Sequence, residues 1–190
     1  MTSLWDRMQH DHDRIWELLN ALTGGATRPE GDPTELRKTA RDLVALFSVH
    51  EATEEMVIWP EVRQRCPDGD ALLGTALDQE GQAKWAVNEL LHVASGSPEF
   101  EDCVQTIAGL ARTHISYEQS QIWPRLADVL SDADADALAH RWDVERRRAP
   151  SRPHPHTPAN PALLATFGRL HAKLDRTRDA AALRRLGELA

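Results

Sequence analysis

A pair of residues able to bind metal occurs twice in the sequence at the same spacing. His50 is followed four residues later by Glu54, and His114 is followed four residues later by Glu118. Each pair leads into Ile-Trp-Pro, and the two segments are 64 residues apart. Residues four apart on an α-helix lie on the same face, so each copy presents an imidazole beside a carboxylate. This arrangement is typical of helix bundles that hold two iron or manganese ions in their core.

Two further polar residues, His12 and Glu80, interrupt the apolar stripes of two other predicted helices. A single histidine in such a stripe is more often a hydrogen-bonded core residue than a ligand, but an inward carboxylate needs a compensating charge. A small rotation of the helix around Glu80 would turn Gln79 or Gln82 inward instead. With the repeated pairs, the sequence predicts six metal ligands, which are His12, His50, Glu54, Glu80, His114 and Glu118.

Tyr117, the only tyrosine of the chain, is a candidate catalytic residue. It lies three residues after His114, so its phenol can lean toward the metals as a hydrogen-bond donor or a ligand. The alternative is a partly buried tyrosine at the edge of the bundle, where the first copy of the repeat has Thr53. The sequence leaves both interpretations open.

Four amphipathic helices with short connections are expected to position these residues. Capping residues mark the starts of the first, second and fourth helices, and in the second and fourth a first-turn proline follows the cap. Because the second pair of helices repeats the first, the sequence predicts an all-α fold, an antiparallel up-down four-helix bundle over residues 1–130 built from a duplicated helical hairpin. The predicted helices run from Ser3 to Gly24, from Pro33 to about Arg65, from about Asp70 to Ala94, and from Ser97 through Ile122.

Additional helices are predicted after the bundle. Residues 131–148 fit a short accessory helix, residues 149–161 a Pro-rich linker, and residues 162–190 a C-terminal helix with an apolar face. That face requires a partner surface, either on the same bundle or on a second subunit, so we expect a monomer or a homodimer.

Charge and composition limit the classes of partner and metal site that this chain can have. Residues 1–140 carry 11 basic and 25 acidic side chains, whereas residues 141–190 carry 11 basic and 5 acidic ones. The acidic body argues against nucleic acid as a partner, and the basic tail is expected to pack on it. The two cysteines do not cluster, which disfavours a thiolate zinc site and leaves nitrogen and oxygen ligands. No apolar run is long enough for a membrane and the first residues lack signal-peptide features, so we expect a cytoplasmic protein.

The pattern of His12, His50 with Glu54, and His114 with Glu118 resembles the hemerythrin-like proteins, the HHE cation-binding family. The resemblance covers residues 1 to about 130 and is strengthened by the two Ile-Trp-Pro copies. It implies a non-haem centre of two iron ions with an oxo or hydroxo bridge, with manganese as an alternative metal. It also implies a small ligand, namely hydrogen peroxide, O2 or nitric oxide.

One departure from the family pattern affects the expected activity. The third-helix histidine of the family is Glu80 here, which gives three histidines and three carboxylates. Such a site stabilises ferric iron and is closer to di-iron redox enzymes than to the five-histidine oxygen carriers. Among relatives from high-GC bacteria some decompose peroxide, and the 19 arginines against 3 lysines fit such a genome. We therefore expect a catalase-like enzyme; the alternatives are an O2- or nitric oxide-binding module and a scaffold with a vestigial or iron-storing site.

Overall fold

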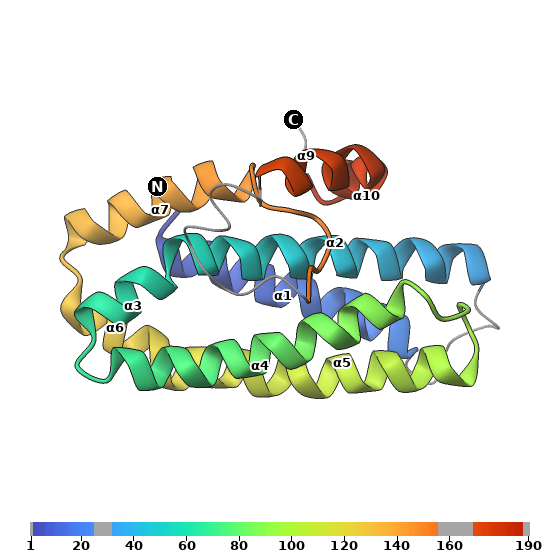
Figure 1. The fold of residues 1–190 in the computed structure, drawn as a ribbon, viewed down its shortest axis with the longest axis horizontal. Coiled ribbons are helices and arrows are strands. Elements are labelled where there is room, and N and C mark those ends of the chain that lie inside the picture. Colours follow the sequence, from blue (N-terminus) through green and yellow to red (C-terminus); the bar gives the residue numbers. More distant parts are fainter. Residues whose placement is uncertain (1, 25–31, 156–168, 188–190) are drawn as a thin grey trace.

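The computed structural model of the protein describes residues 2–24, 32–155 and 169–187. Four long antiparallel helices form a bundle in which each packs against two neighbours, as Figure 1 shows. The all-α four-helix bundle with additional C-terminal helices is therefore confirmed. None of the helices in these ranges is long and apolar enough to cross a membrane. The bundle helices are α1 (Leu4–Thr23), α2 (Pro33–Val57), α4 (Gly69–Leu90) and α5 (Pro98–Tyr117).

Local capping interactions set where the bundle helices begin. The Ser3 hydroxyl accepts from the backbone N–H of Asp6, whose carboxylate accepts in return from the Ser3 N–H. Asp32 caps α2, and Ser97 caps α5, each directly before a proline in the first turn. These side chains satisfy backbone donors that have no partner within the helix. The helix starts predicted at these three caps are confirmed.

The second predicted helix is not continuous to Arg65, as expected from its pattern, but breaks at Ile58 into α2 and α3 (Trp59–Arg65). Pro60 has no backbone N–H to donate to the Met56 carbonyl, and Arg141 donates to that carbonyl instead at 2.5 Å. The equivalent part of the second copy contains a π-helical turn, η1 (Glu118–Ile122), before α6 (Trp123–Val129). The regular α-helix is thus interrupted ahead of the proline in both copies, by a break in the first and by a π-helical turn in the second.

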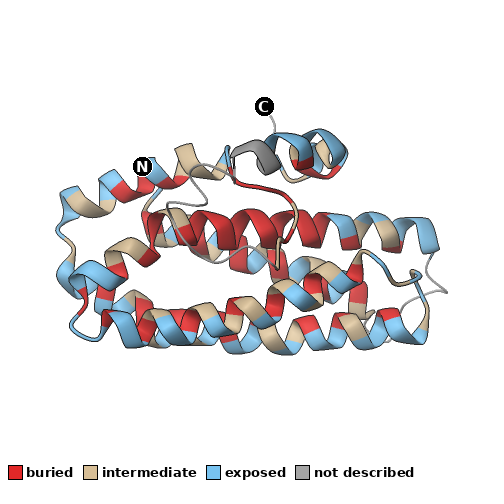
Figure 2. Ribbon diagram, viewed as in Figure 1, coloured by how far each residue is buried: buried red, intermediate tan, exposed pale blue. Residues whose placement is uncertain are grey.

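Helix α2 is the most deeply buried element, as Figure 2 shows. Its outer face is covered by α7 (Asp132–Arg146) and by α10 (Ala180–Arg185). The helical period that turns His50 and Glu54 inward predicts that Glu51 and Glu55 face outward to solvent, but their exposed fractions are 1% and 5%. That expectation was wrong because a second layer covers the side of α2 that points away from the bundle.

The C-terminal part of the chain packs on the same bundle. The region expected to form one C-terminal helix contains α9 (Arg169–Arg178) and α10, which meet at Asp179. Leu183 of α10 is completely buried against α2. Residues 149–155 run across α2 with Ala149 and Ser151 buried, whereas the remainder of the predicted linker and the predicted helix start, residues 156–168, lie outside the described ranges. Ion pairs of Arg185 with Asp42, Arg152 with Asp179 and His154 with Asp175 accompany this packing.

Candidate metal centre

The six predicted ligands come together at mid-depth in the bundle. Each is buried, with an exposed fraction of 2% or less. They lie between two apolar clusters that fill the two ends of the bundle, so the polar pocket is isolated from bulk water. Each helix of the bundle contributes: His12 comes from α1, His50 and Glu54 from α2, Glu80 from α4, His114 from α5 and Glu118 from the first residue of η1.

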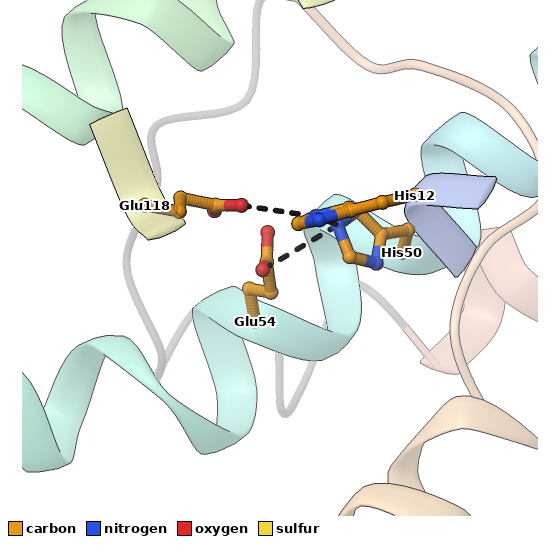
Figure 3. A group of neighbouring side chains, drawn as sticks. All are labelled: His12, His50, Glu54 and Glu118. Atoms are coloured by element: carbon orange, nitrogen blue, oxygen red, sulfur yellow. Dashed lines mark hydrogen bonds and ion pairs between the residues drawn. The ribbon is translucent and has the colours of Figure 1, made fainter. Parts of the chain in front are cut away.

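Four of these side chains, which we name the first ligand group, are His12, His50, Glu54 and Glu118. Their ligand atoms lie within 4.8 Å of one another. His12 Nε2 lies 3.0 Å from Glu118 Oε2, and His50 Nε2 lies 3.4 Å from Glu54 Oε1 (Figure 3). The two imidazoles also face each other, with their Nε2 atoms 3.2 Å apart. Two imidazole nitrogens and two carboxylates therefore converge from three segments of the chain.

A second ligand group consists of Glu54, Glu80 and His114, again within 4.8 Å of one another. Glu54 belongs to both groups. Glu118 also spans them, because its Oε1 lies 3.1 Å from His114 Nε2 while its Oε2 approaches His12. The glutamate of each repeated pair thus lies between the two groups, as a carboxylate that bridges two cations must.

The orientation of two of the imidazoles is fixed by side chains behind them. His50 Nδ1–H donates to Asp11 Oδ2 at 3.1 Å, and Arg146 of α7 donates to the same oxygen. His114 Nδ1–H donates to Gln79 Oε1 at 3.2 Å. In both cases the bond at Nδ1 leaves Nε2 to face the centre. Gln79 therefore supports a ligand from behind, while the neighbouring Glu80 is the residue that points inward.

Glu80 is held by two donors. Trp59 Nε1–H donates to Glu80 Oε1 at 2.6 Å, and Lys84 Nζ donates to Oε2 at 3.3 Å. Lys84 also donates to Glu55, so one ammonium group compensates two carboxylates. The other tryptophan of the repeat, Trp123, stacks on His12 with ring centroids 5.3 Å apart. The repeated Ile-Trp-Pro motif thus supplies an aromatic contact to the centre in both copies.

The pKa values show how much negative charge is concentrated here. Burial raises the pKa of the Glu54 carboxyl well above its usual value, and the carboxylates of Glu118 and Glu80 raise it further. Burial likewise raises the pKa of Glu80 to about 7. Burial lowers the pKa of His114, but Glu118 outweighs it and raises this pKa to about 9. Burial acts to raise the pKa of Glu118, yet His114 and His12 hold it well below its usual value.

Glu51 is a seventh polar side chain beside the centre. Its Oε1 is buried without a hydrogen-bond partner. Burial raises the pKa of Glu51 well above its usual value; the Lys84 ammonium acts in the opposite direction, and the Glu80 carboxylate raises it again. A cavity of about 40 Å³ lies against Glu51, Glu55 and Lys84. That volume is sufficient for a molecule the size of water.

The donor set fits metal cations. Both carboxylate oxygens of Glu54 and both of Glu118 are buried, and apart from the imidazoles of the ligand set no described residue donates a hydrogen bond to them. A buried acceptor without a donor costs about 1–3 kcal/mol, and a buried charge costs more. Cations coordinated by these oxygens and by the imidazole nitrogens would remove both costs. Nitrogen and oxygen donors without thiolates suit iron or manganese.

Tyr117 is placed differently from the six predicted ligands. It is the last residue of α5, and its hydroxyl donates to the Leu72 carbonyl of α4 at 3.3 Å. Its ring packs with the apolar cluster at the α3 end of the bundle. Among the described contacts none joins the phenol to a ligand, so the catalytic role of Tyr117 stays a prediction.

The sequence patterns did not select several residues that surround the metal ligands. Asp11, Trp59, Lys84 and Glu51 contact or face the ligands although no spacing rule selected them. For Trp59 a signal was available, because the tryptophan is repeated with the ligands. Asp11 and Glu51 each adjoin a ligand in sequence, which places them on a different face of the helix. Their role depends on which segments cover that face.

Comparisons with known proteins match the bundle to a family. A family model described as the hemerythrin HHE cation binding domain matches residues 3–126. A protein named DNA nickase from Nostoc sp. (strain PCC 7120 / SAG 25.82 / UTEX 2576) is 22% identical over 150 residues, which is 79% of this chain. The chain spans only 40% of that relative's length.

A crystal structure has a similar fold. It is that of a hemerythrin HHE cation binding domain-containing protein, an Rv2633c homolog from Mycobacterium kansasii. The TM-score is 0.66 at 16% identity, and the alignment covers 92% of this chain and 99% of that one. With the family model extending over all six predicted ligands and both copies of the repeat, the chain belongs to the hemerythrin HHE cation-binding domain family.

Proposed function

We propose that this protein holds two iron ions between its two ligand groups and decomposes hydrogen peroxide. The observation that carries the proposal is the set of four buried oxygens of Glu54 and Glu118, to which no described residue outside the ligand set donates and which lie against the imidazoles of both groups. A pair of carboxylates placed in this way binds two cations close together, as two-metal chemistry requires. In the reaction one peroxide accepts two electrons and two protons to become two waters. A second peroxide gives up two electrons and two protons to become O2.

The three carboxylates favour turnover over reversible binding. When bound, the two irons supply a two-electron redox couple and open positions for a small ligand. Glu80 brings a hard oxygen donor to the position where the family pattern has a histidine, which favours the ferric state. Trp59 and Lys84 hold that carboxylate in place with two hydrogen bonds. The orientation of Glu80 is therefore fixed before any ligand arrives.

The residues around the metal centre determine which molecules have access to it. The apolar clusters on both sides exclude bulk water and large reductants from the bundle core. The cavity of about 40 Å³ beside Glu51 and Lys84 has room for a molecule close to water in size. Hydrogen peroxide, O2 and nitric oxide are small enough to enter this cavity, whereas larger substrates are not. We propose this cavity as the entry point for the small ligand.

A direct test is O2 evolution from added hydrogen peroxide, measured with an oxygen electrode on iron-loaded protein. We expect turnover by the unmodified protein and by His10→Ala, since His10 is exposed. Loss of turnover is expected for His12→Ala and His114→Ala, which remove ligands. Metal analysis of the same samples should give about two irons per chain, and manganese would be detected by the same measurement.

Other results would contradict this proposal and favour a different function. A stable oxygenated form with no O2 evolution from peroxide would favour an O2-binding or nitric oxide-binding module. Less than one metal ion per chain after growth with iron would favour a vestigial site. The nicking activity named for the Nostoc relative is not proposed here, because this chain spans only 40% of that protein. A cytoplasmic location and a monomeric or homodimeric state remain predictions for fractionation and for sedimentation measurements.

A further inference from the structure

A second cavity, of about 620 Å³, lies away from the metal centre between the first turns of α2 and the C-terminal helices. Figure 1 shows α9 and α10 packed over the middle of α2, beyond its first turns. The wall formed by α2 includes Arg37, Lys38 and Arg41. The opposite wall includes Arg152, Arg178 and Arg185. Asp179 is the one carboxylate among the described lining residues, so six cationic side chains face one acidic side chain. We name this space the basic cavity.

Four of the six cations already have partners. Arg152 donates through two nitrogens to Asp179, at 2.8 Å each, and Arg185 donates to Asp42. Arg37 donates to two backbone carbonyls at the end of α4, and Lys38 donates to Glu35. These contacts hold the walls of the basic cavity in place.

Arg41 and Arg178 differ from the other four. Both are exposed, and within the described ranges neither forms a hydrogen bond or ion pair. They approach the cavity from α2 and from the end of α9, which are the two facing walls. The Ser95 hydroxyl, which also lines the cavity, is buried without a partner. The basic cavity thus presents two guanidinium groups that are available to a ligand, with the buried Ser95 hydroxyl in its lining.

The charge distribution indicates an anionic ligand. Arg152, Arg185 and Lys38 are paired with carboxylates, but the remaining three cations leave the lining with an excess of positive charge, which concentrates counter-ions in a cleft. This positive region stands out on a protein with a net charge of −8. Guanidinium groups bind phosphate oxygens in a bidentate manner, more specifically than they bind a simple point charge. No described lining residue is aromatic, so the cavity offers no surface for stacking a nucleobase.

We propose that the basic cavity binds a small anion with several phosphate groups, of the chemical class of pyrophosphate and tripolyphosphate. Its volume is within the usual range for small-molecule sites. Cationic side chains on both α2 and the C-terminal segments suit a ligand that carries several phosphate groups rather than a single one. A nucleic-acid strand is disfavoured because the bundle outside this cavity is acidic. The proposal is independent of the activity at the metal centre.

Isothermal titration calorimetry of the full chain with pyrophosphate and with tripolyphosphate tests the proposal. The double variant Arg41→Ala/Arg178→Ala removes the two arginines that have no partner and should weaken binding at least about tenfold. Arg184→Ala is the matched control, because Arg184 is an exposed arginine on α10 that does not line the cavity. It removes one positive charge from the same region, where the double variant removes two, and should leave binding unchanged. Sulfate should bind at least about tenfold more weakly than pyrophosphate.

Four results would overturn the proposal. The first is no binding of either phosphate compound. The second is that Arg184→Ala weakens binding as much as the double variant, which would indicate only a general charge effect. The third is binding that persists in the double variant and is lost in His12→Ala, which would place the phosphate on the metal. The fourth is binding of a single-stranded oligonucleotide that depends on Arg41 and Arg178 and is not displaced by pyrophosphate. Thermal unfolding of each variant, compared with the unmodified protein, checks that the fold is retained.

Discussion

Asp11 and His50 are joined by a hydrogen bond of 3.1 Å between Oδ2 and Nδ1–H, although 39 residues separate them. Arg146 of α7 donates to the same Asp11 oxygen. His50, one of the two imidazoles of the first ligand group, is therefore oriented by α1 and, through Arg146, by α7. Arg146 lies beyond residues 3–126, which the family model matches. In this protein the orientation of a predicted ligand depends on a helix outside the matched domain.

Asp11→Asn is expected to lower metal affinity by about 10- to 100-fold, because it removes the negative acceptor that orients His50. Asn keeps the shape of the side chain, so the fold should be retained. Affinity can be measured by competition with a chelator of known strength. Asp13→Asn is the matched control, because Asp13 is on the same helix but exposed. Equal affinities for the two variants would contradict the role of Asp11.

Arg146→Met should also reduce metal affinity, by about tenfold, because Asp11 loses the cation that fixes its position behind His50. Burial by itself raises the pKa of Asp11, while His50 and Arg146 lower it below its usual value. The variant should therefore also weaken the hold of Asp11 on His50. Arg147→Met removes a neighbouring exposed arginine and serves as the control. If both variants bind metal as tightly as the unmodified protein, α7 has no part in the centre.

The stability of the metal-free protein should fall as the pH rises from about 5 to 9. Glu80 has a pKa of about 7 in the folded state, above its usual 4.5, so its contribution is full below 4.5 and lost as the pH rises through 7. His114 has a pKa of about 9 against the usual 6.5, so its contribution is lost as the pH rises through 9. Urea unfolding across this range gives the free energy of unfolding. A flat profile, or the same slope in Glu80→Gln between pH 5 and 7, would contradict this assignment.

Bound metal should remove much of this pH dependence, since cations take the place of the protons. The comparison of metal-free and metal-loaded protein thus tests whether the protons and the metals share the same carboxylates.

Leu183→Ala should destabilise the protein by about 2–5 kcal/mol, because this fully buried side chain fills the contact between α10 and α2. Leu174→Ala is the matched control on α9, where the side chain is 52% exposed, and it should change stability by no more than about 0.5 kcal/mol. Thermal or urea unfolding provides both values. A similar small effect of the two variants would mean that the C-terminal helices do not stabilise the bundle. A dependence of the Leu183 effect on protein concentration would point to a contact between subunits.

The sequence by itself determined the elements of the bundle and the group of residues at its centre. Periodicity and capping residues are local signals, so Ser3, Asp32 and Ser97 marked helix starts that the structure has. The spacing of His50 with Glu54 and of His114 with Glu118 fixed which side chains share a helix face, and the duplication indicated that the faces meet. These inferences required only the geometry of a single helix and the repeat.

Only the tertiary structure decided what surrounds that centre. Glu51 lies one residue from His50 and therefore on another face of α2, and it became buried because later segments cover that face. The bonds from Trp59 to Glu80 and from Arg146 to Asp11 join side chains that the helical period does not relate. The break before Pro60 and the π-helical turn before Pro124 likewise differ although the motif is the same. Helical periodicity determines which residues share a face, whereas the covering of each face depends on packing between distant segments.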